Sequence, residues 1–399
     1  MSALKDKVIE LSHQFHKDAV SCRRHIHMHP ELSFEEKETG LFVQKTLEEI
    51  GIGFTSGWAG HGVVGMIEGN RPDSAVIALR ADLDALPIQE ENTAEYVSRN
   101  PGVMHACGHD VHTASLLSAA RILHTVRDKF DGTIKLIFQP GEEKTPGGAS
   151  IMIKEGVLEK PSPSAIFGQH VYPQLPAGHF GFKADRYMAS ADEINLRVVG
   201  KGGHGAIPQL TIDPIAIAAQ IITGMQQIIS RMADPTLPAV LTFGKIESEG
   251  GTYNVIPNAV KILGTFRTYD EDWREKALVK VREVAEGIAA SFGATCEVHI
   301  ERGYPFLVND QRLTEMSCEA AVDIVGSENV HELPLRMTAE DFAYYSHQVP
   351  GCFYRMGVAN QARNITSSVH TPTFDIDESA LQSAPAVMAW IALRQLSAG

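Results

Sequence analysis

Three apolar runs, interrupted only by Lys135 in the second, are each followed closely by chemically active side chains, and they constrain the fold most strongly. The runs cover residues 75–79, 134–138 and 165–167. Continuous apolar runs of this length are typical of strands that helices cover on both faces, as in a parallel sheet. Helix-like segments at 33–50 and 110–124 alternate with these strands. The alternation predicts an α/β fold.

The residues that follow these runs can share one site. Asp82 and Asp84 follow the first run, Glu142 and Glu143 the second, and His170 the third. Open α/β sheets bind ligands beyond the carboxyl ends of their strands. We therefore expect all three groups to lie at one edge of a sheet.

From about residue 187 the pattern changes to half-exposed strands and long helices. The order is strand, helix, two strands, helix, strand, which is the ferredoxin-like order. The expected elements cover residues 193–199, 212–229, 240–246, 260–267, 273–291 and 295–300. We predict an inserted α+β domain at 187–300, with residues 1–186 and 301–399 forming a discontinuous catalytic α/β/α domain.

Composition narrows the class of partner and compartment. The 399 residues carry a net charge of −14 without a dense basic run, which argues against nucleic-acid binding. No apolar run reaches the roughly 18 residues that a membrane span needs, and the first residues do not resemble a signal peptide. The five scattered cysteines favour a reducing compartment. We expect a cytoplasmic protein without a membrane partner.

A metal site is the chemical hypothesis that these residue types favour. Cys107 and His109 have i, i+2 spacing, which in an extended segment directs both side chains the same way. Thiolate, imidazole and carboxylate suit zinc best, with manganese, nickel or cobalt also compatible. Of the adjacent Glu142 and Glu143, one can bind metal while the other handles protons. The alternatives are a buried apolar cysteine and a solvated acidic turn.

Other histidines are weaker candidates. Three of them, His25, His27 and His29, alternate along the chain and could chelate a metal from one strand face, but they lie far upstream among arginines. His112 and His124 are expected to be core or helix-surface residues. A further one, His105, lies beside Cys107 and is a candidate to support the ligands.

Six ordered motifs together resemble the amidohydrolase branch of the aminoacylase and carboxypeptidase metallopeptidases. That branch includes hippurate hydrolases, N-acyl-amino-acid deacylases and auxin-conjugate hydrolases. The motifs are RADLDALP (80–87), MHACGHD (104–110), QPGEE (139–143), GGHGA (202–206), AEDFA (339–343) and VHTP (369–372). The resemblance spans nearly the whole chain and implies hydrolysis of the amide bond of N-acyl amino acids, either hippurate-like or N-acetylated.

The resemblance also implies a role for each motif residue. Two divalent metals per subunit would be bound by Cys107, His109, Glu143, His170 and His370. Glu142 then matches the general base, and Asp82 or Asp84 would orient a ligand. The resemblance further implies that the inserted domain is a lid through which the protein forms a homodimer or higher homo-oligomer. His204, in this domain, matches a residue that reaches an active site, usually that of the partner subunit. Asn254 and Arg267 match residues that bind the substrate carboxylate, although Arg267 could instead form a surface ion pair.

Several positions depart from the family pattern. Gly141 replaces the usual Ala, Lys144 and Val111 each replace Gly, and Gln209 replaces a common His. None of these changes removes an expected ligand, but Gln209 weakens any inference about acyl preference. A dipeptidase or carboxypeptidase with the same site is the nearest alternative, and a non-catalytic binding protein is the next.

Overall fold

The computed structural model describes residues 2–398, which form two compact units. Unit 1 comprises Met1–Tyr187, Val308–Leu335 and Asp341–Gly399, apart from the two terminal residues. Unit 2 comprises Met188–Leu307 and Arg336–Glu340. The predicted roles of the segments divided at residues 187 and 300, a catalytic domain and an inserted lid, stay a prediction.

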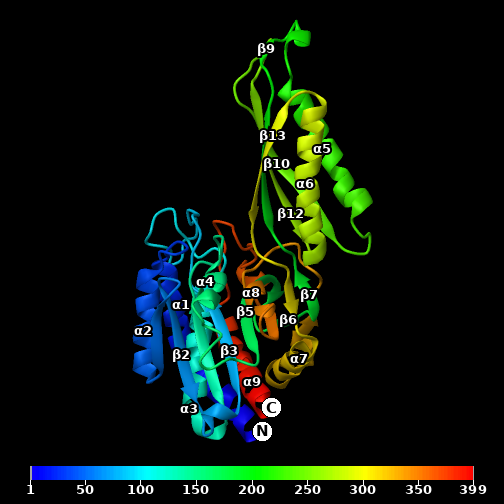
Figure 1. Cartoon of the computed structure of the whole chain (residues 1–399). Helices are drawn as coiled ribbons and strands as arrows, with labels where there is room; N and C mark the ends of the chain where they lie inside the picture. Colours follow the sequence, from blue (N-terminus) through cyan, green and yellow to red (C-terminus); the bar gives the residue numbers. More distant parts are fainter. Residues whose placement is uncertain (1, 399) are drawn as a thin grey trace. The chain divides into compact units, whose positions relative to one another are not determined.

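Unit 1 contains an eight-stranded mixed sheet between layers of helices (Figure 1). The four strands at its centre run parallel, in the order β4, β3, β5, β16. The full order, with bounds, is β1 (Gly53–Trp58), β2 (Gly62–Glu68), β4 (Thr133–Gln139), β3 (Val76–Asp82), β5 (Ile166–Pro176), β16 (Gly351–Ala359), β6 (Phe180–Phe182) and β15 (Val330–Glu332).

The predicted apolar runs are central strands of this sheet. All seven residues of β4 are buried, as are the last six of β3, because both faces of these strands are covered. The predicted α/β fold is therefore confirmed. His170 lies inside β5 and not beyond its end as expected, since β5 continues to Pro176.

Helices bury the two faces of the sheet of unit 1. On one side α3 packs against α1, α2 and α9, and α7 packs against α9; on the other, α4 contacts β4 and α8. Their bounds are α1 (Ser2–Met28), α2 (Lys37–Ile50), α3 (His109–Thr125), α4 (Gly148–Lys154), α7 (Gln311–Val325), α8 (Ala343–Ser346) and α9 (Ala380–Ala398). None of the helices among residues 2–398 has the length and apolar character that a membrane span requires.

Contacts with distant residues shape the ends of α3 and α1. Gly108, with φ +81°, occupies the N-cap of α3, whereas the carboxylate of Asp110 binds Arg23 at 2.8 Å and His27 at 2.8 Å. His25 and His27 belong to α1 and not to a strand, so they point to different sides, and His29 follows the helix. His27 is buried, and its two ring nitrogens lie against the carboxylates of Asp110 and Glu90.

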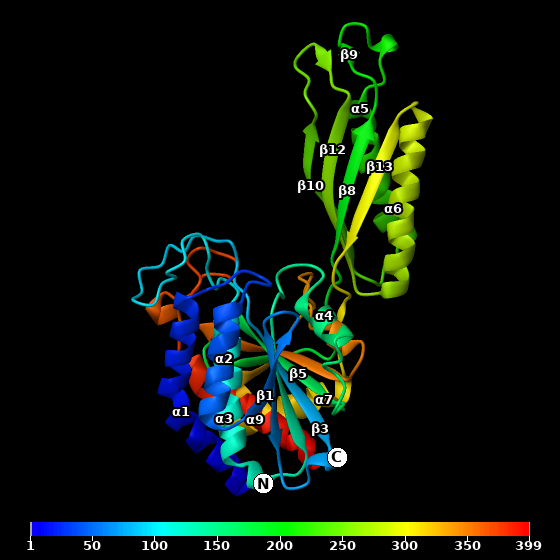
Figure 2. The same cartoon turned by 60° about the vertical axis from the view of Figure 1, so that its left-hand side comes forward.

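Unit 2 is a four-stranded antiparallel sheet with two helices (Figure 2). Its chain order is β8 (Asp192–Val199), α5 (Pro214–Gln227), β10 (Ala239–Ser248), β12 (Ala259–Thr268), α6 (Glu271–Ser291) and β13 (Thr295–Arg302). The spatial order is β10, β12, β8, β13. This is the predicted ferredoxin-like arrangement, and apolar residues of both helices bury the inner face of the sheet.

Candidate metal centre

Unit 1 brings together all five side chains that the sequence nominated as metal ligands. The Sγ atom of Cys107 lies 3.5 Å from Nε2 of His170 and 3.3 Å from Nε2 of His370. Oε1 of Glu143 lies 3.2 Å from Nε2 of His370 and 3.8 Å from Nε2 of His109. These residues come from positions up to 263 apart in the chain.

Two ligand groups of this cluster share Cys107. Cys107, His109 and His170 form one group, and Cys107, Glu143 and His370 form the other. Within each group the ligand atoms all lie within 4.8 Å of one another. Such a pair of overlapping groups is what a centre of two ions requires.

The backbone around Cys107 is shaped for this convergence. Gly108 has φ +81°, and a Cβ atom there would lie 2.7 Å from a methyl carbon of Val171, so only glycine fits. His370 also has a positive φ, +62°, which costs a non-glycine residue free energy. Its amide donates to the carbonyl of Ala106 at 2.7 Å, and this bond holds the imidazole beside Cys107.

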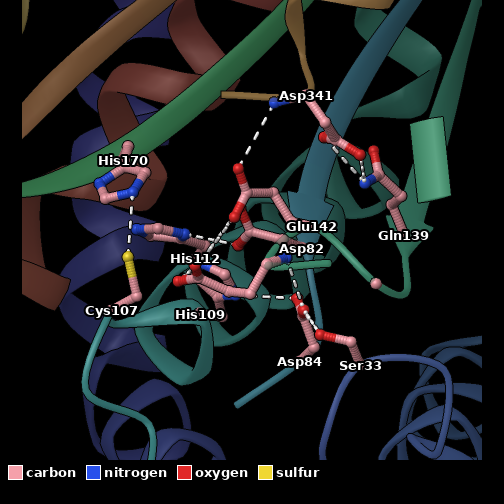
Figure 3. Close-up of polar contacts among 12 residues, drawn as sticks. Ser33, Asp82, Asp84, Cys107, His109, His112, Gln139, Glu142, His170 and Asp341 are labelled. Atoms are coloured by element: carbon pink, nitrogen blue, oxygen red, sulfur yellow. Dashed lines mark hydrogen bonds and ion pairs between the residues drawn. The ribbon is translucent and has the colours of Figure 1, made fainter. Parts of the chain in front are cut away.

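Asp84 orients two of the candidate ligands (Figure 3). Its Oδ1 lies 3.1 Å from Nδ1 of His109, and its Oδ2 accepts from the amide of Glu143 at 2.9 Å. Ser33 donates a further hydrogen bond to Oδ2 at 2.7 Å. A carboxylate on Nδ1 leaves Nε2 of His109 free to bind a cation, which is a common arrangement in metal sites.

Asp82 supports a different histidine. Its Oδ1 lies 2.6 Å from Nδ1 of His112, and Nε2 of His112 accepts from the amide of Val171 at 2.8 Å. His112 is therefore a buried histidine with both ring nitrogens bonded, as the sequence suggested. His105 is buried as well, but neither of its ring nitrogens has a hydrogen-bond partner among the described residues, and burial lowers its pKa to about 4.

The donor set is suited to a cation. Nε2 of His109 is buried without a hydrogen bond among the described residues. Burial lowers the pKa of His109, but Asp82, Asp84 and Glu143 outweigh it and raise the pKa to about 10. Burial, with Glu143, also raises the pKa of the Cys107 thiol well above its ordinary value. A thiolate is stable among these carboxylates only when positive charge accompanies it, so the residues present fit divalent metal ions.

Glu142 is the carboxylate of the cluster with a separate position. It is 6% exposed, and its Oε2 lies 3.9 Å from Nε2 of His109. Its Oε1 accepts from the backbone amide of Asp341 at 3.4 Å (Figure 3). The candidate general base is therefore adjacent to the candidate ligands and is held from the opposite side.

The remaining sequence-predicted residues belong to unit 2. His204 lies in β9 (Gly203–His204), which pairs with β11 (Val255–Ile256), and the carbonyl of Asn254 accepts from Gly205 at 2.7 Å. Arg267, near the end of β12, is half-buried and donates to the carbonyl of Met337 at 2.9 Å. Within unit 2, His204 and Asn254 are thus neighbours, while Arg267 is bonded elsewhere.

A model of peptidase family M20/M25/M40 matches residues 78–394, which include every candidate ligand. The chain belongs to this family. A relative named N-acyl-L-amino acid amidohydrolase, from Geobacillus stearothermophilus, is 43% identical over 76% of this chain and 81% of its own. Thermostable carboxypeptidase 2 of Saccharolobus solfataricus is 38% identical over 94% of both chains.

A solved M20 structure has the same fold. It is a Bacillus subtilis protein described as a dinuclear metal-binding peptidase, with a TM-score of 0.81 and 37% identity over 96% of this chain and 99% of that one. Together with the two ligand groups, this M20 neighbour supports a centre for two divalent metals. The assignment of individual ligands remains our proposal.

The sequence did not reveal the buried residues that hydrogen-bond to one another and to the segment that carries Glu142. Arg80, Gln139 and Asp341 lie inside the motifs that carried the resemblance, yet the sequence assigned them no role. Glu36, which accepts from the amide of Gly141 at 2.7 Å, lies outside every motif. A charged residue within an apolar strand, such as Arg80 in β3, is the signal that could have indicated the network of Arg80, Gln139 and Asp341.

Proposed function

We propose that this M20 hydrolase cleaves the amide bond of N-acyl amino acids and releases a carboxylic acid and a free amino acid. The observation that carries the proposal is the position of Glu142, a nearly buried carboxylate beside five potential ligand side chains. The relative named N-acyl-L-amino acid amidohydrolase supports the substrate class. Zinc is the expected metal, and manganese, nickel or cobalt are alternatives that suit the same ligands.

The ligand set proposed from the sequence is Cys107, His109, Glu143, His170 and His370. When bound, two divalent ions would supply Lewis acidity and lower the pKa of water. Asp84 would keep His109 in the tautomer that presents Nε2, because its carboxylate lies against Nδ1. His170 is fixed in the same sense, since its Nδ1 lies 2.8 Å from the carbonyl of Val171.

Glu142 would carry the proton through the reaction. As water attacks the amide carbon, Glu142 accepts its proton, and it transfers that proton to the amine nitrogen as the carbon–nitrogen bond breaks. The Asp341 amide keeps Oε1 of Glu142 in place during both transfers. The products are then a carboxylate and a free amino group, and Glu142 is again ionised.

Three residues of unit 2 are proposed to bind the substrate, on the strength of their motifs. His204 would donate to the oxygen on which negative charge develops, a contribution of about 3 kcal/mol for comparable donors. Asn254 and Arg267 would bind the free carboxylate of the amino acid, because a guanidinium can form paired charged hydrogen bonds with it. Among the described residues no salt bridge occupies Arg267.

The proposal is tested by measuring amine release from N-acetyl and N-benzoyl amino acids and from dipeptides, after loading with one metal at a time. We expect turnover of the acylated substrates. Glu142→Gln should retain metal and lose at least ~10² in kcat, the usual size of a general-base effect. Glu155→Gln is the matched control, because Glu155 accepts from the amide of Ala59 and has no part in the cluster. Normal turnover by the Glu142 variant would refute its role.

A carboxypeptidase or dipeptidase is the second candidate, because a carboxypeptidase is among the relatives that match 94% of the chain. The same panel distinguishes the two functions. Faster cleavage of dipeptides with free amino termini than of any N-acyl amino acid would favour the peptidase. For the metal, Cys107→Ala should lower the bound stoichiometry measured by elemental analysis, and unchanged stoichiometry would exclude Cys107 as a ligand.

A further inference from the structure

Three side chains of unit 1 form a buried polar network beside the candidate general base. The network consists of Arg80, Gln139 and Asp341, and none of the three is more than 1% exposed. Arg80 donates through Nε to Oε1 of Gln139 at 3.0 Å and through Nη2 to Oδ1 of Asp341 at 2.7 Å. Nε2 of Gln139 donates to both oxygens of Asp341, at 3.0 and 2.8 Å. Each member therefore contacts the other two.

The network connects three segments that are distant in sequence. Arg80 lies in β3 and Gln139 is the last residue of the adjacent β4, whereas Asp341 follows more than 200 residues later. The amide of Ala149, in the first turn of α4, also donates to Oδ2 of Asp341 at 3.0 Å. A carboxylate that receives this many hydrogen bonds in a buried position has little freedom to move.

The network fixes both partners of the hydrogen bond to Glu142. Gln139 precedes Glu142 by three residues in the same strand-to-loop segment, so it holds the backbone that carries the base. Because the side chain of Asp341 is anchored by these bonds, the backbone of the same residue is restricted in position. Its amide donates to Oε1 of Glu142 at 3.4 Å (Figure 3). Figure 3 shows Asp341 between Gln139 and Glu142, with a dashed contact to each.

We propose that Asp341 is a positioning residue for proton transfer, which orients Glu142 through its backbone amide and is itself oriented by Arg80 and Gln139. This inference rests on the proposed role of Glu142. The isosteric change Asp341→Asn places an amide group against the donors of Arg80 and Gln139. The resulting donor–donor contacts move the Asp341 backbone, and a small misplacement of a catalytic group can cost about 10²-fold in rate. We expect a fall in kcat of about tenfold or more, with KM nearly unchanged.

A double-mutant cycle separates this role from a general loss of structure. Asp341→Asn is measured alone and in the Glu142→Gln background, with the metal-loaded full chain. If Asp341 acts through Glu142, it has no further effect on kcat once Glu142 is gone. The same fold-loss in both backgrounds would overturn the proposal. The Glu142→Gln variant alone reports on the proposed function, so failure of that function is recognised separately.

Charge exchange provides a rescue that does not depend on the residual activity of the Glu142 variant. Gln139→Glu alone places two carboxylates together and should also lose activity. The double variant Gln139→Glu/Asp341→Asn restores one carboxylate opposite one amide, and it should recover part of the kcat lost by either single change. A double variant no better than the poorer single one would contradict the network. If Asp341→Asn does not fold, Gln139→Met replaces it in the cycle.

Asp323→Asn is the matched control for the loss of a carboxylate in unit 1. Asp323 accepts from Nε1 of Trp390 at 2.9 Å and pairs with Arg394 at 2.7 Å, and it contacts none of the candidate ligands. Its replacement should lower stability without changing kcat. Metal content, measured by elemental analysis, should be the same in all variants. A fall in metal content that accounts for the lost kcat would assign Asp341 to the metal centre and overturn the positioning role.

Discussion

Replacing Gly141 by alanine tests how tightly the segment before Glu142 is built. Gly141 has φ +66°, a conformation that costs an L-residue about 1–2 kcal/mol. A Cβ atom there would lie 2.4 Å from Cε1 of Phe34. Phe34 itself has φ +69°, so its backbone has few alternative positions. Such overpacking adds about 1–3 kcal/mol, and together the two effects should destabilise unit 1 by about 2–5 kcal/mol.

Gly102 supplies the control for the backbone contribution. It has φ +79°, and a Cβ atom there would meet no other atom within 4 Å. Gly102→Ala should therefore cost only the conformational part, about 1–2 kcal/mol. Urea unfolding of both variants, followed by fluorescence, gives the difference that belongs to the contact with Phe34. Adding Phe34→Ala to Gly141→Ala should recover part of that difference.

The activity of Gly141→Ala should fall as well. The amide of Gly141 donates to Oε1 of Glu36 at 2.7 Å, and displacement of this residue displaces Glu142, its neighbour in the chain. We expect kcat to decrease while Gly102→Ala retains normal turnover. Equal unfolding free energies for the two alanine variants, with unchanged kcat, would refute the argument from the Phe34 contact.

Three further predictions concern other parts of the site. Asp84→Asn should weaken metal affinity about 10- to 100-fold in chelator competition, since Asp84 orients a proposed ligand, and Ser33→Ala, which keeps the carboxylate, should have a smaller effect. Burial and Asp84 raise the pKa of Glu36 from 4.5 to about 8, so the folded state binds more protons than the unfolded state between these values. Stability should therefore fall as pH rises from about 4.5 to 8, and Glu36→Gln should remove this part of the dependence in urea titrations at several pH values; an unchanged profile would argue against it. Mixing His204→Ala with Glu142→Gln subunits should restore hydrolysis if His204 acts in the partner's site, whereas activity no greater than the sum of the two variants would place it in its own.

Local pattern was sufficient to predict the strands that carry the site. The runs of β3, β4 and β5 are buried and mostly apolar, so their place at the centre of a sheet could be predicted from their composition. Their parallel pairing brings Asp82 beside Gln139, close to the two glutamates. The ferredoxin-like order of unit 2 was equally accessible, because its half-exposed strands and long helices have distinct periods.

Long-range pairing of buried charges limited the prediction of the site. Asp110 has the sequence context of an N-cap, but Arg23 binds it from 87 residues away and Gly108 takes the cap. The alternation of histidines near residue 27 is also compatible with a strand face, whereas α1 buries His27 against Asp110 and Glu90. Nothing local in sequence indicates that Asp341 lies beside Arg80, 261 positions earlier.

The strands through which the chain first leaves and first re-enters the larger unit are partners in one two-stranded sheet, β7 (Asp185–Met188) with β14 (Leu307–Asn309). Because these two crossing points are adjacent, the intervening segment can lengthen, shorten or be exchanged at little cost to the scaffold that it interrupts. All five proposed ligands are encoded outside that segment. Substitutions within that segment can therefore change the proposed substrate contacts while the proposed ligands stay unchanged.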